Sequence, residues 1–318
     1  MPLNVAVQMD PMEGIAIAGD SSFALMLAAQ ARGHHLFHYL ASDLSYRDGR
    51  VSALARPVEV RPSQGDHFSF GEPTRLDLAA DTDVVLMRQD PPFDLAYITA
   101  THLLERVHGH GTLVVNDPAS VRNAPEKLFV LDYVRFMPPT LITRSLDEAR
   151  AFQTEHGDIV VKPLYGNAGS AVFKVPANGA NLGSLVELFG QVWVEPFMIQ
   201  AFLPSVAQGD KRIVLIDGKV SGAINRIPGA GEIRSNLAAG GTAHPAELTL
   251  REQEICDALG PELARRGLLF VGIDVIGGEY LTEINVTSPT GIVAIDRFNG
   301  TDTPALIWDA IEAKVAAQ

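Results

Sequence analysis

The sequence predicts an α/β fold whose N-terminal third holds a parallel β-sheet. Short apolar segments alternate with segments of helical length between residues 3 and 116, which is typical of βαβ units. After about residue 120 the alternation gives way to strands joined by tight turns and longer loops. The chain has 318 residues, enough for two or three domains, and 47% hydrophobic residues, enough for a sizeable core. We therefore expect a Rossmann-like parallel-sheet domain followed by a part of different architecture.

The N-terminal part alternates strands with helices, and helix-capping residues support the assignment. Asp20 or Ser21 is a suitable N-cap for the first helix, and Gly33 is a suitable residue just past its end. Residues 9–14 follow the first strand but lack the GxGxxG pattern, so NAD binding is not predicted. The elements expected in this part are strands at 3–8, 83–87 and 112–116 and helices at 21–32 and 95–108.

The remainder of the chain combines hairpins, helices and one long loop. Ser145 and Glu148 form a capping-box pattern at the start of one helix, and Thr249 and Glu252 form another. Pro261 is expected to kink or interrupt the second of these helices. The other elements expected here are a strand at 158–164 and a return strand ending at 175, a buried strand at 193–203, a hairpin from 210 to 226 with a turn at 217–218, strands at 270–276 and 280–286, and a final helix at 304–317.

Asp274, Glu283 and Asn285 are the candidate metal ligands. Asp274 precedes a Gly-Gly turn, and Glu283 and Asn285 follow it. With a two-residue turn, Asp274 pairs with Leu281, and the three polar side chains project from one face of the hairpin. Oxygen ligands of this kind suit Mg²⁺ bound beside nucleotide phosphates, whereas the alternative is an acidic, solvated hairpin face. A turn one residue longer is expected to separate the three side chains.

Lys127 and Lys162 are candidate phosphate contacts. Lys162 stands just before the small-residue loop 165–170, whose backbone N–H groups can approach phosphate oxygens closely. This loop joins two strands, so it differs from the GxxxxGK[ST] loop that leads into a helix. The alternative is an ordinary tight turn beside two solvated lysines.

Two loops are in positions that suit a ligand. Residues 88–94 follow a strand of the parallel sheet, and ligands of open α/β sheets gather beyond the carboxyl ends of strands. Residues 227–241 show little helix or strand pattern, and a loop of this length in a compact chain is usually functional or disordered. Glycines near both ends would let it move as a cover. We expect the stretch 228–241 to be mobile without ligands.

The composition excludes several classes of function. The formal net charge of −13 argues against a nucleic-acid or anionic-membrane partner. Cys256 is the one cysteine, so an intrachain disulfide is excluded. No apolar window is long enough to span a bilayer, and the N terminus lacks the basic and apolar regions of a secretory signal. These features predict a cytoplasmic protein.

The order of the motifs resembles that of prokaryotic glutathione synthetases, which are ATP-grasp ligases. The most specific segment is 281–291, LTEINVTSPTG, which contains two of the candidate metal ligands. The resembling segments run in the expected order from residue 1 to about residue 312 and cover essentially the whole chain. The other segments are 20–23 (DSSF), 87–94 (MRQDPPFD), 123–128 (NAPEKL), 209–212 (GDKR), 226–228 (RIP), 236–241 (NLAAGG) and 270–274 (FVGID).

The resemblance implies a domain organisation and a reaction. An N-terminal substrate domain at 1–122 would precede a two-lobed ATP-grasp domain at 123–318, with a central lobe at 123–200 and a C-terminal lobe at 201–318. The implied reaction ligates γ-glutamylcysteine to glycine through an acyl phosphate and gives glutathione, ADP and phosphate. The implied cofactors are ATP and Mg²⁺, or Mn²⁺ in its place. The implied assembly is a homotetramer that binds neither nucleic acid nor membrane.

The resemblance also assigns roles to individual residues. Asp274, Glu283 and Asn285 would hold the metal ion, and Arg212 and Arg226 would hold the acyl phosphate and the substrate carboxylate. The residues that would contact the nucleotide are Lys127, Lys162, Gly166, Gly169, Gln200, Ala201, Phe202, Leu203 and Asp210. The residues that would shape the substrate site are Arg88, Asp90, Arg234, Asn236, Gly240, Gly241, Ser288, Pro289 and Thr290.

Three features differ from the family pattern, and two other functions stay open. Ala168 replaces a common glycine, Thr242 replaces a common arginine, and Asp274 and Glu283 are one residue further apart than expected. The alternatives are another ATP-grasp carboxylate–amine ligase, such as a glutamate-adding protein-tail ligase, and a nucleotide-binding module without catalysis. The intact metal ligands and paired arginines favour an active enzyme.

Overall fold

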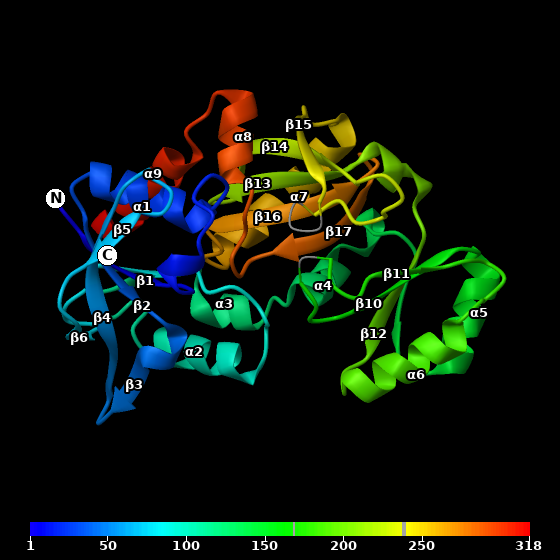
Figure 1. Ribbon diagram of the computed structural model, residues 1–318, viewed down its shortest axis with the longest axis horizontal. Helices are drawn as coiled ribbons and strands as arrows, with labels where there is room; N and C mark the ends of the chain where they lie inside the picture. The colour runs from blue at the N-terminus through cyan, green and yellow to red at the C-terminus, as the bar shows by residue number, and fades with distance from the viewer. Residues whose placement is uncertain (168, 237–239) are drawn as a thin grey trace.

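The computed structural model describes residues 1–167, 169–236 and 240–318. Within these residues the strands form an eight-stranded, a four-stranded and a five-stranded sheet. The five-stranded sheet lies between the other two, with the N-terminal sheet at one end of the molecule and the four-stranded sheet at the other (Figure 1). The predicted α/β fold is confirmed.

The N-terminal sheet has a parallel centre, as predicted, and antiparallel additions that were not predicted. Its parallel strands are β1 (Asn4–Gln8), β7 (Val84–Met87) and β8 (Leu113–Val115), which were predicted, and β2 (His35–Tyr39), which was not. Its antiparallel strands are β3 (Leu44–Arg47), β4 (Arg50–Val60), β5 (Phe68–Phe70) and β6 (Thr74–Asp77). The loop after β7 reaches the site described below, because Asp90 and Pro91 line a cavity together with residues of the five-stranded sheet.

Capping side chains define the helices of this part. Asp20 Oδ1 accepts a hydrogen bond from Phe23 N at 2.6 Å and starts α1 (Ser21–Ala31). Gly33, with φ +81°, follows its end, as the sequence predicts. The other helices of the first 136 residues are α2 (Leu95–Glu105), α3 (Pro118–Arg122), α4 (Glu126–Phe129) and the 3₁₀ helices η1 (Met12–Gly14), η2 (Ala41–Asp43) and η3 (Val130–Phe136).

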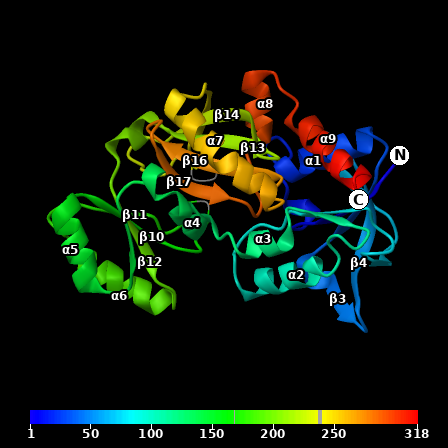
Figure 2. The ribbon, with the colours of Figure 1, turned by 180° about the vertical axis from the view of Figure 1, so that it is seen from behind.

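The last helix returns to the N-terminal sheet. The helix α9 (Thr303–Ala316) lies beside α1 in both ribbon views (Figure 2). Trp308 is fully buried there, and its Nε1 donates to the carbonyl of Leu25 at 2.9 Å. The preceding helix, α8 (Ile292–Asn299), packs against the five-stranded sheet. The C-terminal segment therefore ties the two larger sheets together.

The four-stranded sheet forms a lobe with its own apolar core. Its strands are β9 (Thr140–Thr143), β10 (Ile159–Pro163), β11 (Phe173–Val175) and β12 (Phe197–Ala201), and its helices are α5 (Leu146–His156) and α6 (Leu182–Val192). The strand predicted at 193–203 is shorter, because Trp193 is the C-cap of α6, with its N–H bonded to the carbonyl of Phe189, and β12 begins only at Phe197. Ser145 caps α5, but its own N–H donates to Thr143 Oγ1, so the predicted capping box is only half formed.

The five-stranded sheet carries the hairpin with the candidate metal ligands. Its strands are β13 (Asp210–Ile216), β14 (Lys219–Ile227), β15 (Thr242–Pro245), β16 (Phe270–Ile276) and β17 (Tyr280–Asn285); η4 (Pro204–Gln208) precedes it and α7 (Leu250–Arg265) covers it. The capping box of Thr249 and Glu252 is confirmed. The predicted interruption at Pro261 is wrong: α7 continues, held on both sides of the proline by the fully buried Leu259 and Leu263.

The sheets differ in how they share their cores. The N-terminal and five-stranded sheets contribute jointly to two apolar clusters, whereas the four-stranded lobe has a separate cluster. None of the helices in the described ranges has the length and apolar character needed to cross a membrane.

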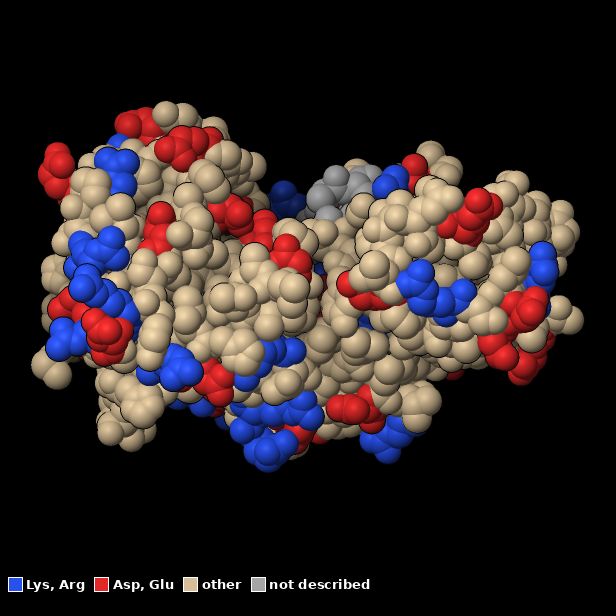
Figure 3. All heavy atoms as spheres, turned by 90° about the horizontal axis from the view of Figure 1, so that it is seen from below, with Lys and Arg blue, Asp and Glu red and all other residues tan. Residues whose placement is uncertain are grey.

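Acidic and basic side chains are interspersed on the face drawn in Figure 3. The separate core makes the four-stranded lobe the part best suited to move relative to the rest. The domain boundaries remain predictions.

Candidate active site

The β16–β17 hairpin has a different register from the one predicted. Ile276 pairs with Tyr280, so the turn has three residues and not two. The pairing then shifts, and Asp274 lies opposite Glu283. The predicted pairing of Asp274 with Leu281 is therefore wrong, because the turn is longer than the Gly-Gly signal suggested.

A bulge restores the arrangement that the longer turn would have destroyed. Thr282 is the extra residue between the two registers, and its hydroxyl donates to the carbonyl of Asp274 at 3.2 Å. Because Asp274 faces Glu283 directly and Asn285 lies two residues further on, the three side chains share one face after all. The predicted grouping is confirmed, although its geometric reason differs.

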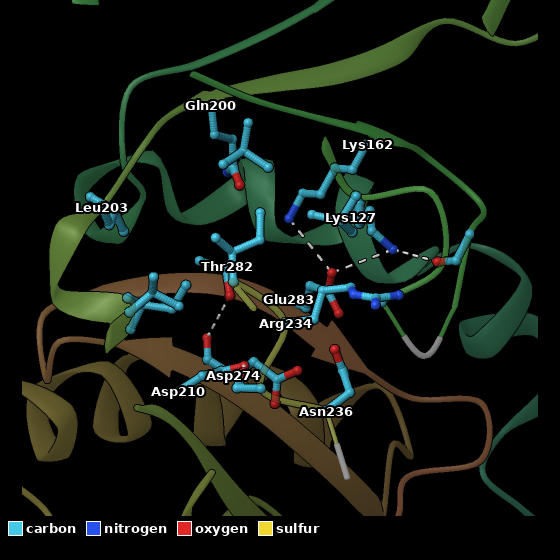
Figure 4. A pocket seen from close by; sticks show the side chains of 18 of the residues that line it. Lys127, Lys162, Gln200, Leu203, Asp210, Arg234, Asn236, Asp274, Thr282 and Glu283 are labelled. Carbon is cyan, nitrogen blue, oxygen red and sulfur yellow. Dashed lines mark hydrogen bonds and ion pairs between the residues drawn. The ribbon is translucent and has the colours of Figure 1, made fainter. Parts of the chain in front are cut away.

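A first cavity of about 890 Å³ opens between the four-stranded lobe and this hairpin (Figure 4). All nine residues predicted to contact a nucleotide line it. They are Lys127, Lys162, Gly166, Gly169, Gln200, Ala201, Phe202, Leu203 and Asp210. Apolar side chains such as Val160 and Ile276 lie among them, so the cavity offers both apolar walls and fixed charges.

Two buried lysines converge on Glu283 at one end of this cavity. Lys127 Nζ lies 3.4 Å and Lys162 Nζ 3.6 Å from Glu283 Oε1 (Figure 4). Lys127 and Lys162 are only 4% and 6% exposed. Burial lowers the pKa of Lys162, and Glu283 partly offsets this. Burial alone would raise the pKa of Glu283, but the two lysines outweigh it and hold that pKa below its usual value. The cluster thus concentrates positive charge where polyphosphate would be bound.

A second cavity lies on the other side of Glu283 and contains the predicted arginine pair. Arg212 Nε and Arg226 Nη2 approach Asp274 Oδ1 at 2.6 and 2.9 Å. Burial acts to raise the pKa of Asp274, but the two guanidinium groups outweigh it and keep the pKa well below its usual range. Arg212 and Arg226 also line the second cavity, so their forks are fixed by a carboxylate while they face the open space.

Asp210 connects Arg226 to the loop before β15. Its Oδ2 accepts hydrogen bonds from Arg226 Nη2 at 2.6 Å and from Ser235 Oγ at 2.8 Å. Burial raises the pKa of Asp210 to about 6, with Arg226 acting against the shift. Ser235 is 3% exposed, so the described residues before position 237 are anchored at the cavity wall.

The three predicted ligands fit a hard divalent cation. Two carboxylates and one amide lie together on paired strands, and Glu283 lies on the wall shared by the two cavities. Among the described residues, no three His, Cys, Asp or Glu side chains gather as a metal-binding group. The amide of Asn285 is therefore essential to the predicted set, and its Nδ2 donates to Asp274 Oδ2 at 3.4 Å.

The residues predicted to shape the substrate site are distributed over several positions. Asp90, Asn236, Ser288, Pro289 and Thr290 line the second cavity. Arg234 lines the first cavity and is paired with Glu232. Gly240 and Gly241 line neither cavity, but Gly241 N donates to the carbonyl of Asn236 at 3.1 Å. Arg88 lines neither cavity; it donates hydrogen bonds to Ser22 Oγ and to the carbonyl of Pro289, a residue of the second cavity's wall, both at 2.9 Å. These roles stay predictions.

Sequence reasoning missed three residues with polar side chains that line the second cavity. They are Glu126, Asn167 and Thr287. Glu126 and Thr287 lie inside segments that resemble the family, and Asn167 lies in the small-residue loop 165–170; each is next to a residue that was singled out. No periodicity or spacing distinguishes them, because only the folded chain shows which way these side chains face.

Solved structures with this fold include ATP-grasp proteins. The crystal structure of D-cycloserine synthetase DcsG has a TM-score of 0.70 at 16% identity and covers 98% of this chain and 100% of its own. The structure of the ATP-grasp ligase PsnB complexed with minimal precursor has a TM-score of 0.64 at 19% identity, over 98% and 99% of the two chains. At such identities the likeness shows the fold alone. The chain therefore has the fold of an ATP-grasp ligase.

Comparison of sequences narrows the class to one family. Residues 3–122 match the N-terminal domain, and residues 126–300 the ATP-grasp domain, of prokaryotic glutathione synthetase. The glutathione synthetase of Rhodopseudomonas palustris is 59% identical over 316 residues, which cover 99% of this chain and 100% of the relative. That of Agrobacterium fabrum is 58% identical over 315 residues, or 99% and 98% of the two chains. The chain belongs to the prokaryotic glutathione synthetase family, and the predicted resemblance is confirmed.

Proposed function

We propose that this chain ligates γ-glutamylcysteine to glycine with ATP, through an acyl phosphate, and releases glutathione, ADP and phosphate. One observation carries the proposal: the two cavities meet at Glu283, with Lys127 and Lys162 on one side and the arginine pair on the other. A phosphoryl group could pass between ligands bound in the two cavities without a covalent protein intermediate. Close similarity to glutathione synthetases along the whole chain supports the choice of substrates.

The first half of the reaction activates the peptide carboxylate. One carboxylate oxygen of γ-glutamylcysteine attacks the γ-phosphorus of ATP, and ADP leaves. Lys127 and Lys162 would balance the negative charge of the phosphates, and Arg212 and Arg226 would hold the carboxylate and the new acyl phosphate. A divalent cation held by Asp274, Glu283 and Asn285, which we propose to be Mg²⁺ or Mn²⁺, would neutralise charge on the transferred group.

The second half forms the amide bond. The neutral amine of glycine attacks the acyl carbon, the carbon–oxygen bond to phosphate breaks, and phosphate leaves with the bonding electrons and accepts the proton that the nitrogen loses. Water at this point would hydrolyse the acyl phosphate. Ile233, Arg234 and Asn236 lie in the described part of the loop before β15 and line the first cavity, so this loop is placed to exclude water.

The experiment that tests the function is ADP release measured with each substrate omitted in turn. We expect Mg²⁺-dependent ADP formation that requires both γ-glutamylcysteine and glycine, with glutathione identified by mass spectrometry. ATP turnover that ignores either substrate, or a different amide product, would contradict the proposal. The alternative of a protein-tail ligase is tested directly by replacing glycine with glutamate as the amine and γ-glutamylcysteine with a glutamate-tailed peptide as the carboxylate.

A further inference from the structure

The turn after β17, residues 286–291, is held in place by side chains from other parts of the chain. Arg88 Nη2 donates to the carbonyl of Pro289 at 2.9 Å, and Arg212 Nη1 donates to the carbonyl of Thr290 at 3.1 Å. From its second residue onward, the turn lines the second cavity. Because buried backbone groups need hydrogen-bond partners, the side chains that supply them fix the shape of this part of the cavity wall.

Asn116 holds the first residue of the turn. It follows β8 in the N-terminal sheet, and its Nδ2 donates to the carbonyl of Val286 at 2.7 Å and to that of Phe270 at 2.8 Å. Its Oδ1 accepts a hydrogen bond from the N–H of Phe270 at 2.8 Å. The last pair of the β16–β17 ladder is Gly272 with Asn285. The side chain of Asn116 therefore bridges the two strands where their own pairing ends.

Ser21 holds the last residue of the turn. It is the first residue of α1, and its Oγ accepts a hydrogen bond from the N–H of Gly291 at 3.2 Å. Ser21 and Asn116 are only 1% and 3% exposed, and neither lines the first or the second cavity. Both belong to the part of the chain that forms the N-terminal sheet. This part therefore fixes both ends of the turn through side chains that do not face the cavity.

We propose that Asn116 and Ser21 are positioning residues that hold the turn 286–291 in the shape that binds the carboxylate substrate. This inference rests on the proposed ligase function and extends it to residues outside the substrate site. The metal ligand next to the turn is held separately, because Asn285 Nδ2 donates to the carbonyl of Gly272 at 3.2 Å. None of the turn's residues lines the first cavity, so nucleotide binding does not depend on the turn.

The test is the steady-state kinetics of Asn116→Ala with each substrate varied in turn. The change removes three hydrogen bonds, and a misplacement of about 1 Å can cost roughly a hundredfold in rate. We expect the KM for γ-glutamylcysteine to rise roughly ten- to a hundredfold. The KM for ATP and the Mg²⁺ requirement should stay close to those of the wild type. An unchanged KM for γ-glutamylcysteine in the folded variant overturns the proposal.

Thr112→Val is the matched control for a loss of stability alone. Thr112 stands just before β8, at the other end of the same strand, and its buried Oγ1 donates to the carbonyls of Leu78 and Thr82, both at 2.8 Å. Its replacement should lower the melting temperature, whereas the folded molecules should keep the KM values of the wild type. An equal rise in the KM for γ-glutamylcysteine in Thr112→Val would attribute the effect to destabilisation and overturn the proposal.

Ser21→Ala keeps the proposal testable if Asn116→Ala fails to fold. It removes one hydrogen bond to the turn and leaves the N-cap of α1 at Asp20 in place. We expect the KM for γ-glutamylcysteine to rise about three- to tenfold, with no change for ATP. Calorimetric binding of γ-glutamylcysteine, with Mg²⁺ and a non-hydrolysable ATP analogue present, should weaken by the same factor. Binding at wild-type affinity would contradict the positioning role.

Wild-type protein assayed in parallel separates this inference from the function on which it rests. Absence of glutathione with the wild type contradicts the proposed function. Normal wild-type activity, together with unaltered kinetics in folded Asn116→Ala and Ser21→Ala, contradicts only the positioning role.

Discussion

Replacing Glu283 by Gln removes one negative charge from the point where the two cavities meet. The side chain keeps its size, and 21% of it is exposed. Its two lysine contacts lie at 3.4 and 3.6 Å, where Coulomb attraction at an effective dielectric constant of about 20 is roughly 5 kcal/mol each before desolvation is counted. Breaking a buried ion pair typically costs about 3–5 kcal/mol of stability.

The cost for Glu283→Gln should lie below that range. Burial already lowers the pKa of Lys162, so this lysine can lose its proton when its anionic partner is removed. We therefore expect a folded protein with a stability loss of about 1–3 kcal/mol. Catalysis should suffer more: removal of one electrostatic stabiliser of the transition state predicts at least about a hundredfold loss of turnover, or ~2.7 kcal/mol.

The assay is ADP release as a function of Mg²⁺ concentration, alongside thermal unfolding of the same samples. We expect a raised Mg²⁺ requirement and low turnover at saturation in Glu283→Gln. Glu279→Gln changes an exposed carboxylate of the same hairpin and should match the wild type in both measurements. Near-normal turnover of Glu283→Gln at saturating Mg²⁺ would refute the reasoning and leave Glu283 as a partner of the two lysines only.

Three further predictions concern the loop and the arginines. Trypsin should cleave after Arg234 in the ligand-free protein and much more slowly with nucleotide and an acyl-phosphate mimic bound; equal rates would make this stretch a fixed wall. Gly241→Ala should lower kcat/KM because its Cβ would come within 2.1 Å of the carbonyl oxygen of Ser235, whereas Gly229→Ala meets only ordinary contacts and should stay near normal. Arg226→Lys keeps the charge but loses the planar fork that holds two carboxylates, so about a tenfold or larger loss of kcat/KM is expected.

Local signals predicted much of the fold. These signals are interactions between residues only two or three positions apart in the sequence. The structure has a helix cap at Asp20 and at Thr249 and a tight turn at Asp217-Gly218. The antiparallel strands β3 to β6 were missed although Asp48-Gly49, between β3 and β4, is a turn signal of the same kind as Asp217-Gly218. Helix α6 was missed because its buried Phe189 matters only through contacts with the sheet beneath it.

The hairpin of Asp274 and Glu283 shows where sequence reasoning stops. The Gly-Gly pair identified the turn but not its length, and the compensating bulge at Thr282 depends on pairing along both strands. The nucleotide-contact residues were predicted from the family resemblance, and all of them line one cavity. Glu126 was not assigned a role, because the second cavity that it lines is formed by loops from different lobes. The homotetramer and the cytoplasmic location remain predictions from the sequence.

The transfer of oxygen from substrate to phosphate tests the central claim most directly. γ-Glutamylcysteine labelled with ¹⁸O in its cysteinyl carboxylate is incubated with ATP, Mg²⁺ and glycine, and the released phosphate is analysed by mass spectrometry. Ligation through an acyl phosphate predicts one ¹⁸O atom in phosphate for each glutathione formed. Unlabelled phosphate released together with glutathione would contradict the account.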